Sequence, residues 1–149
     1  MYQVMSDIHA CNVLELNKIH NPSGNITIYQ NGLNHLINVK RVYYLYDVPS
    51  GSERGGHAHK ELYQIIIAAS GSFDVILDDG FNKKIVSLNR PNYGLLVVPG
   101  IWREIINFSS GAICLVLASE KYSPEDYIRD YNNFMEWKSS KQAGNLIMK

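Results

Sequence analysis

The segment RGGHAHKELYQ, residues 54–64, stands in an otherwise apolar sequence rich in strand-forming residues. Its two histidines, His57 and His59, are two positions apart, and residues i and i+2 of a β-strand point to the same face of a sheet. Gly55 and Gly56 precede them, and glycine permits a bend and the close approach of another molecule. The segment therefore predicts a strand that brings two imidazole rings together inside a β-barrel.

Residues at fixed distances frame the two histidines. Gly51 lies six residues before His57, and Gln64 lies five residues after His59. Gly71 follows seven residues after Gln64. This spacing is typical of the first motif of cupin barrels, G-x5-H-x-H-x4-E-x6-G, with glutamine in the position of the glutamate. The alternative is two ordinary strand histidines, and the frame favours a functional pair.

The composition indicates a folded chain and excludes several classes of protein. Hydrophobic residues make up 46% of the 149 residues and charged residues 19%, which is typical of one globular domain. Lysine plus arginine and aspartate plus glutamate both number 14, so nothing indicates a basic surface for nucleic acid. No run reaches the roughly 18 apolar residues of a membrane span, and the first residues lack a signal-peptide pattern. We expect a cytoplasmic protein in which Cys11 and Cys114 are free thiols.

Short strands separated by turn residues follow one another through most of the chain. Apart from the histidine segment, strands are expected at 13–19, 25–29, 39–48, 62–69, 72–77, 83–88, 95–98, 101–108 and 112–119. Along 39–48, the side chains of Arg41, Tyr43 and Leu45 share one face. The pattern predicts an all-β protein, a cupin jelly-roll barrel over about 13–119 in a single domain of residues 1–149.

The end of the chain changes its period. Ser123, Pro124 and two acidic residues resemble a helix start. Tyr127, Tyr131 and Phe134 then recur at i, i+4 and i+7. The pattern predicts a short C-terminal α-helix over about 124–137 that packs on the barrel.

The second cupin motif, P-x-G-x2-H-x3-N, is recognisable but one residue short, because Pro99 and Gly100 are adjacent. Gly100 and Asn107 flank a histidine position that holds Arg103. Gln64 is a poor metal ligand and Arg103 carries a fixed positive charge, so two of the four usual ligand positions disfavour a divalent cation. Arg103 suits an anion instead. We expect no metal and no other cofactor, although two histidines and a further carboxylate remain an alternative metal site.

Four segments carry a resemblance to a known family: KRVYYLYDVP at 40–49, RGGHAHKELYQ at 54–64, PGIWREI at 99–105 and VLASEKYSPEDYIRDYNNF at 116–134. Together they resemble the sugar 3,4-ketoisomerases of the FdtA/QdtA type. The resemblance implies a metal-free jelly-roll enzyme of deoxyamino-sugar biosynthesis that acts on dTDP-4-keto-6-deoxyglucose. It also implies a homodimer, in some relatives with exchanged N-terminal strands. Several relatives have W-H-E where this chain has W-R-E, at Arg103.

The resemblance implies that His57 is the catalytic base and that Tyr43 assists it. Spacing alone leaves His57 and His59 both open as the base, because histidine titrates near neutral pH and either ring could take a proton. Tyr43 can act as an acid or as a hydrogen-bond donor. The expected substrate-binding residues are Arg41, Arg54, Gln64, Trp102 and Arg103.

A ketoisomerase has a simple chemical requirement. The C4 carbonyl of a 4-keto sugar acidifies the hydrogen on C3. A base removes this proton, an enediol forms, and a proton returned at C4 leaves the ketone at C3. Two other functions remain open at this stage: another metal-free nucleotide-sugar cupin such as a 3,5-epimerase, and a sugar-binding cupin without catalysis.

Overall fold

The computed structural model describes residues 6–32 and 37–147. In this part of the chain the strands are β1 Val13–Glu15, β2 Asn17–Ile19, β3 Ile26–Ile28, β4 Arg41–Leu45, β5 Arg54–His59, β6 Gln64–Ser70, β7 Phe73–Asp78, β8 Lys83–Leu88, β9 Tyr93–Val97, β10 Trp102–Ile106, β11 Ile113–Ala118 and β12 Tyr127–Ile128. The helices are the 3-10 turns η1 Ile8–Ala10 and η2 Pro124–Asp126, and the α-helix α1 Tyr131–Ile147.

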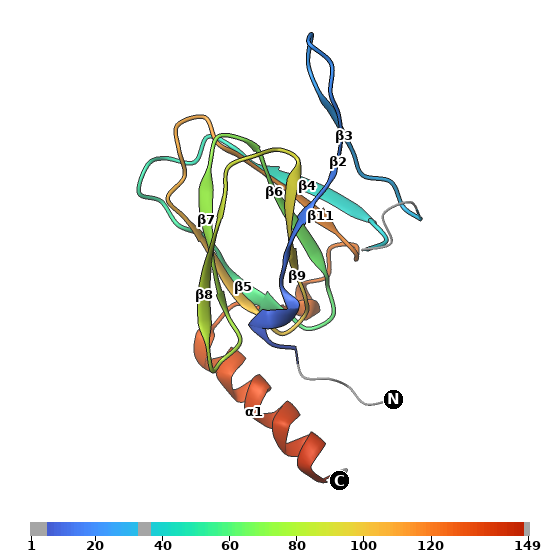
Figure 1. Ribbon diagram of the computed structural model, residues 1–149. Coiled ribbons are helices and arrows are strands. Elements are labelled where there is room, and N and C mark those ends of the chain that lie inside the picture. The colour runs from blue at the N-terminus through green and yellow to red at the C-terminus, as the bar shows by residue number, and fades with distance from the viewer. Residues whose placement is uncertain (1–5, 33–36, 148–149) are drawn as a thin grey trace.

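Two five-stranded antiparallel sheets face each other and form the barrel (Figure 1). One has the strand order β1-β9-β6-β11-β4 and the other β12-β5-β10-β7-β8. Their inner faces enclose an apolar core that includes Phe73, Val75, Leu77, Leu95 and Val97. The predicted all-β cupin jelly-roll barrel with a C-terminal helix is confirmed.

Strand position explains the composition of the strands. β6 lies between β9 and β11, and its residues Gln64 to Ala68 are all buried. This accounts for its nearly continuous apolar sequence. β4 is an edge strand and alternates, so Val42 and Tyr44 are exposed while Tyr43 and Leu45 pack against the core. The inward face of β4 is therefore available to a site inside the barrel.

The predicted strand at 13–19 is two strands. β1 pairs with β9, and β2 pairs with β3 in a separate two-stranded sheet. Leu16 lies between them, is buried, and donates its N–H to the carbonyl oxygen of Asn92 at 2.7 Å. Beyond this point β2 and β3 project away from the barrel (Figure 1).

The C-terminal helix begins later than predicted and runs further. The residues after Ser123 form only the turn η2, and β12 follows it and pairs with β5. α1 begins at Tyr131, where Asp130 caps it by accepting the N–H of Asn133 at 2.9 Å. The prediction of a helix over 124–137 was therefore wrong at both ends. The chain has two possible helix starts, at Ser123 and at Asp130, and the residues between them form η2 and the strand β12 that pairs with β5. Phe134 of α1 packs on Ala58 and Trp102.

Two further features concern glycine and cysteine. Gly71 of the first motif has φ +65°, and a Cβ there would lie 2.4 Å from Ser109 Oγ and 2.9 Å from Ala112 Cα, so the turn requires glycine. Cys11 and Cys114 are free and fully buried, and burial raises the pKa of Cys114 to about 12. Within the described residues, no helix has the length and apolar character needed to cross a membrane.

Candidate active site

A cavity of about 430 Å³ opens between the two sheets. Strands β4, β5, β6 and β10 supply its walls, and the segment after β11 contributes to its rim. Six of the eight residues predicted for the site line it: Arg41, Tyr43, Arg54, His57, Gln64 and Arg103. The other two, His59 and Trp102, lie outside the lining.

The two histidines lie at different depths. Their ring centroids are 4.9 Å apart and nearly perpendicular. His57 lines the cavity, and its buried Nε2 has no hydrogen-bond partner among the described residues. His59 is fully buried, with Nδ1 2.9 Å from Asp126 Oδ2. Of the two rings, only His57 lies in the cavity wall with a ring nitrogen that lacks a partner among the described residues.

Both rings are held in the neutral form. Burial is the main cause that lowers the pKa of His57 to about 2, followed by the positive charge of Arg103. Burial and then Arg103 and Arg41 lower the pKa of His59 to about 2. The Asp126 carboxylate opposes the lowering of the His59 pKa, but full burial of the ring near several guanidinium groups outweighs it. His57 can therefore accept a proton without first losing one.

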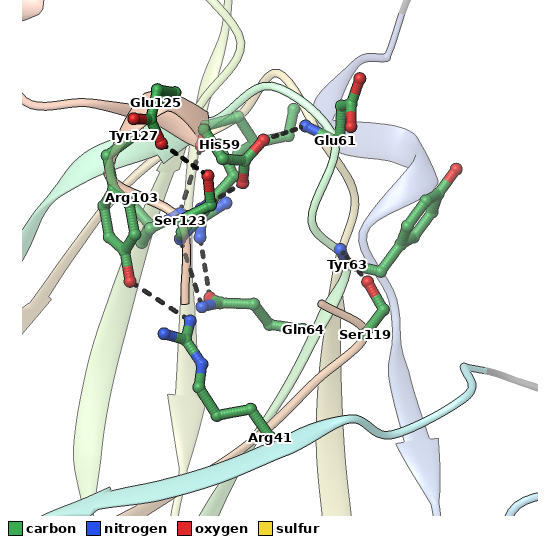
Figure 2. Close-up of polar contacts among 12 residues, drawn as sticks. Arg41, His59, Glu61, Tyr63, Gln64, Arg103, Ser119, Ser123, Glu125 and Tyr127 are labelled. Carbon is green, nitrogen blue, oxygen red and sulfur yellow. Dashed lines mark hydrogen bonds and ion pairs between the residues drawn. The ribbon is translucent and has the colours of Figure 1, made fainter. Parts of the chain in front are cut away.

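Gln64 connects the polar groups at the base of the cavity (Figure 2). Its Oε1 accepts a hydrogen bond from Arg103 Nη1 at 2.7 Å. Its Nε2 donates to the Tyr43 hydroxyl at 3.0 Å and lies 3.5 Å from His59 Nε2. The residue in the glutamate position of the cupin motif thus organises hydrogen bonds.

Arg103 is a buried cation with a free donor. It is 1% exposed, and burial lowers its pKa to about 10, so it remains charged at neutral pH. Its Nε donates to the Ile101 carbonyl oxygen at 3.2 Å, and its Nη2 has no partner among the described residues. A buried guanidinium with an unpaired donor beside a cavity is suited to stabilise negative charge on a bound molecule.

Arginines and tyrosines surround the rim of the cavity. Arg41 Nη2 donates to the Tyr127 hydroxyl at 3.3 Å, and the Arg41 guanidinium lies 5.4 Å from the Tyr122 ring centroid. Arg129 stacks at 4.1 Å over Tyr127. Together with the exposed Arg54, these residues give the opening a positive charge and flat aromatic surfaces.

Tyr122, Tyr127 and Arg129 were missed by the sequence analysis. They stand in the segment at 116–134 that carried the family resemblance. Tyr127 and Arg129 fell within the predicted helix, where Tyr127 was assigned to a helical stripe and not to a strand beside β5.

Trp102 lies on the other side of β10 from Arg103. Its ring packs on Phe134 and Tyr131 at centroid distances of 5.8 and 5.4 Å, and its Nε1–H donates to Glu104 at 3.1 Å. The structure thus places Trp102 under α1, away from the cavity.

The donor set around the cavity does not resemble that of a metal-binding cupin. The oxygen of Gln64 accepts from Arg103, and Arg103 fills the position of the third histidine. Among residues 6–32 and 37–147, no group of three His, Cys, Asp or Glu side chains is arranged to hold a metal ion.

Comparisons with known proteins find relatives over most of the chain. A family model described as FdtA: WxcM-like, C-terminal, matches residues 9–139. The TDP-4-oxo-6-deoxy-alpha-D-glucose-3,4-oxoisomerase of Aneurinibacillus thermoaerophilus is 40% identical over 125 residues, which cover 84% of this chain and 90% of that protein.

Two solved structures are similar throughout the barrel. The WlaRB TDP-quinovose 3,4-ketoisomerase of Campylobacter jejuni is 44% identical with a TM-score of 0.80, covering 85% of this chain and 97% of that one. A histidine-to-asparagine variant of the 3,4-ketoisomerase QdtA of Thermoanaerobacterium thermosaccharolyticum is 34% identical with a TM-score of 0.84, covering 87% and 94%. That variant was solved in complex with TDP-4-keto-6-deoxyglucose.

Proposed function

The chain belongs to the FdtA family of WxcM-like proteins, and we propose that it is a nucleotide-sugar 3,4-ketoisomerase. Its substrate is dTDP-4-keto-6-deoxyglucose and its product is a dTDP-3-keto-6-deoxyhexose. The observation that carries the proposal is the neutral His57 in the cavity wall, with its Nε2 unpaired beside Tyr43 and Arg103.

His57 removes the proton on C3. The electron pair of the C3–H bond forms the C3=C4 double bond, and the C4 oxygen gains a proton, which gives the enediol. The C3 hydroxyl then loses its proton as C4 gains one, and the ketone is left at C3. Tyr43 donates a hydrogen bond or a proton to the reacting oxygens, and the free Nη2 of Arg103 stabilises the negative charge that develops on them.

The pyrophosphate binds at the arginine-rich rim. Arg54, Arg41 and Arg129 are close enough to the opening to line it, and charge-assisted contacts of this kind suit phosphate oxygens. Tyr122 and Tyr127 supply surfaces on which a base can stack. Calorimetric titration should give tighter binding of TDP than of UDP or GDP.

The active form is a homodimer, in which the N-terminal strands are exchanged between subunits. The projecting β2–β3 hairpin, with Ile19 and Ile26 exposed, supports this part of the proposal (Figure 1). A row of exposed apolar side chains on β4 and just after it, Val42, Tyr44 and Tyr46, supports it as well. The free thiols fit a reducing compartment and so support a location in the cytoplasm.

Incubation with dTDP-4-keto-6-deoxyglucose in deuterium oxide tests the function. NMR should show the ketone moving to C3, with deuterium at C4 of the 3-keto product and, through the reverse reaction, at C3 of the remaining 4-keto sugar. Exchange at C3 and C5 with the ketone kept at C4 would instead identify a 3,5-epimerase. Binding of the sugar without any exchange would identify a binding protein. The same spectra give the configuration of the product at C4.

A further inference from the structure

We infer that Asp126, outside the cavity, is a positioning residue for catalysis. Acting through His59 and Gln64, its carboxylate helps to fix the directions of the hydrogen bonds so that the Tyr43 hydroxyl keeps its proton for the cavity. This inference rests on the proposed ketoisomerase activity. It assigns a role to a residue of the turn η2, remote from β5 and β6 in sequence.

Arg103 fixes one end of the chain of hydrogen bonds. A guanidinium only donates hydrogen bonds, so the Gln64 atom 2.7 Å from Arg103 Nη1 has to be the carbonyl oxygen. The amide NH2 of Gln64 then faces the opposite way, toward the Tyr43 hydroxyl and His59 Nε2. Both of these atoms have to receive a hydrogen bond from Gln64 for the arrangement to be satisfied.

Asp126 fixes the other end. A carboxylate only accepts hydrogen bonds, so His59 Nδ1, 2.9 Å from Asp126 Oδ2, has to carry the ring proton. In the neutral ring, Nε2 is then an acceptor, which is the form that the Gln64 NH2 group needs. The second oxygen of Asp126 accepts the backbone N–H of Glu61 at 2.7 Å, which holds the carboxylate in place.

The consequence falls on Tyr43. Its oxygen accepts from Gln64, and no described residue accepts the proton of the hydroxyl, which faces the cavity. Burial raises the pKa of Tyr43, so the phenol keeps this proton at neutral pH. If the Gln64 amide were reversed, its carbonyl oxygen would take the Tyr43 proton away from the cavity. Because Arg103 can only donate and the Asp126 carboxylate can only accept, the hydrogen bonds between them can run in one direction alone. That direction leaves the Tyr43 proton free for the cavity.

The first measurement is the tautomer of His59, by 15N NMR of the full chain. We expect the Nδ1–H form in the wild type. In Asp126→Asn the side-chain oxygen still accepts from Glu61, so the NH2 group faces His59 Nδ1 and donates to it. The ring should then switch to the Nε2–H form. This readout does not depend on activity.

The second measurement is a set of double-variant cycles with Tyr43→Phe. Asp126→Asn removes the acceptor state of His59 Nε2 that the Gln64 NH2 group needs. Gln64→Glu replaces that NH2 group by a carboxylate, which accepts a hydrogen bond from the Tyr43 hydroxyl. Each single variant, like Tyr43→Phe, should lower kcat on the order of 10²-fold with KM little changed. In the Tyr43→Phe background, neither change should lower kcat further, because both act through the lost hydroxyl.

Glu125→Gln is the matched control, since it makes the same change of charge in the same turn and, among the described residues, its carboxylate is hydrogen-bonded to Ser123 and to its own backbone. It should leave kcat and the His59 tautomer unchanged. An Nε2–H tautomer in the wild type, wild-type kcat in either single variant, or losses that multiply with Tyr43→Phe would overturn the inference. If Asp126→Asn does not fold, the wild-type tautomer and the Gln64→Glu cycle still decide. Absence of exchange in the wild type would refute the proposed function instead.

Discussion

His57 presents a free ring nitrogen to the cavity, whereas His59 has Asp126 beside one nitrogen and Gln64 beside the other. We therefore expect His57→Asn to lower the rate of C3 deuterium exchange by about 10²–10⁴-fold, the usual contribution of a general base. His59→Asn should lose less, because it alters only the support of the site. NMR measures the exchange, and calorimetry with TDP checks that binding is retained. Exchange at the wild-type rate in His57→Asn would show that His57 is not the base and would make His59 the candidate.

The two buried histidines also predict how stability depends on pH. Their pKa values are about 2 in the folded protein, whereas a histidine in an unfolded chain titrates near 6.5. Below about pH 6.5 the unfolded chain binds protons that the folded chain excludes, so the free energy of unfolding falls as the pH decreases. Each histidine adds up to about 1.4 kcal/mol per pH unit to this slope, and nothing well above pH 6.5.

Urea unfolding between pH 7.5 and 5 measures this slope. His57→Asn should make it shallower, while His9→Asn, at an exposed position, should leave it unchanged. Equal slopes in the wild type and in His57→Asn would show that His57 binds a proton as readily in the folded protein as in the unfolded chain.

Several site residues could be predicted because strand geometry is regular. The period of two places Arg41 and Tyr43 on one face, and the fixed frame of the cupin motif places His57 and Gln64. The period could not distinguish His57 from His59, because both point to the same face and the residue that pairs with His59, Asp126, lies far along the chain.

At the scale of the elements, the packing of α1 on β10 determines what Trp102 does. Because its ring lies against Phe134 and Tyr131 and not in the cavity, Trp102→Leu should lower the free energy of unfolding by about 1–3 kcal/mol through lost packing. The KM for the nucleotide sugar should stay unchanged. Phe81→Leu, at an aromatic position that is 62% exposed, is the control and should change neither quantity. A strong rise of KM in Trp102→Leu would show that Trp102 contributes to substrate binding.

The C-terminal helix shows where local sequence signals were insufficient. Ser123-Pro124 and Asp130 are both plausible caps, and only the pairing of β12 with β5 selects the second. The strands between 54 and 118 were predicted within a few residues, because turn residues mark both ends of each one. The break at Leu16 was missed, since the apolar alternation continues through the point where the chain leaves the sheet.

At the scale of the whole molecule, the exposed face of β4 predicts self-association. Val42, Tyr44 and Tyr46 are 56%, 59% and 61% exposed on and beside an edge strand, and a surface of this kind favours burial against another protein surface. Light scattering should give the mass of a dimer, and Tyr44→Glu should shift the protein toward the monomer. Phe81→Glu, on the turn between β7 and β8, should leave the dimer intact. A monomer mass for the wild type at all concentrations would contradict the proposed homodimer.

The two buried thiols can report how often the barrel opens. Cys11 precedes β1 and Cys114 lies in β11, and both are sealed from solvent. A thiol is modified as its thiolate, and burial raises the pKa of both groups. A modifying reagent should therefore react only after the surrounding strands separate. The rates at which the two cysteines are labelled would then report how often the N-terminal segment and β11 open, and whether they open together.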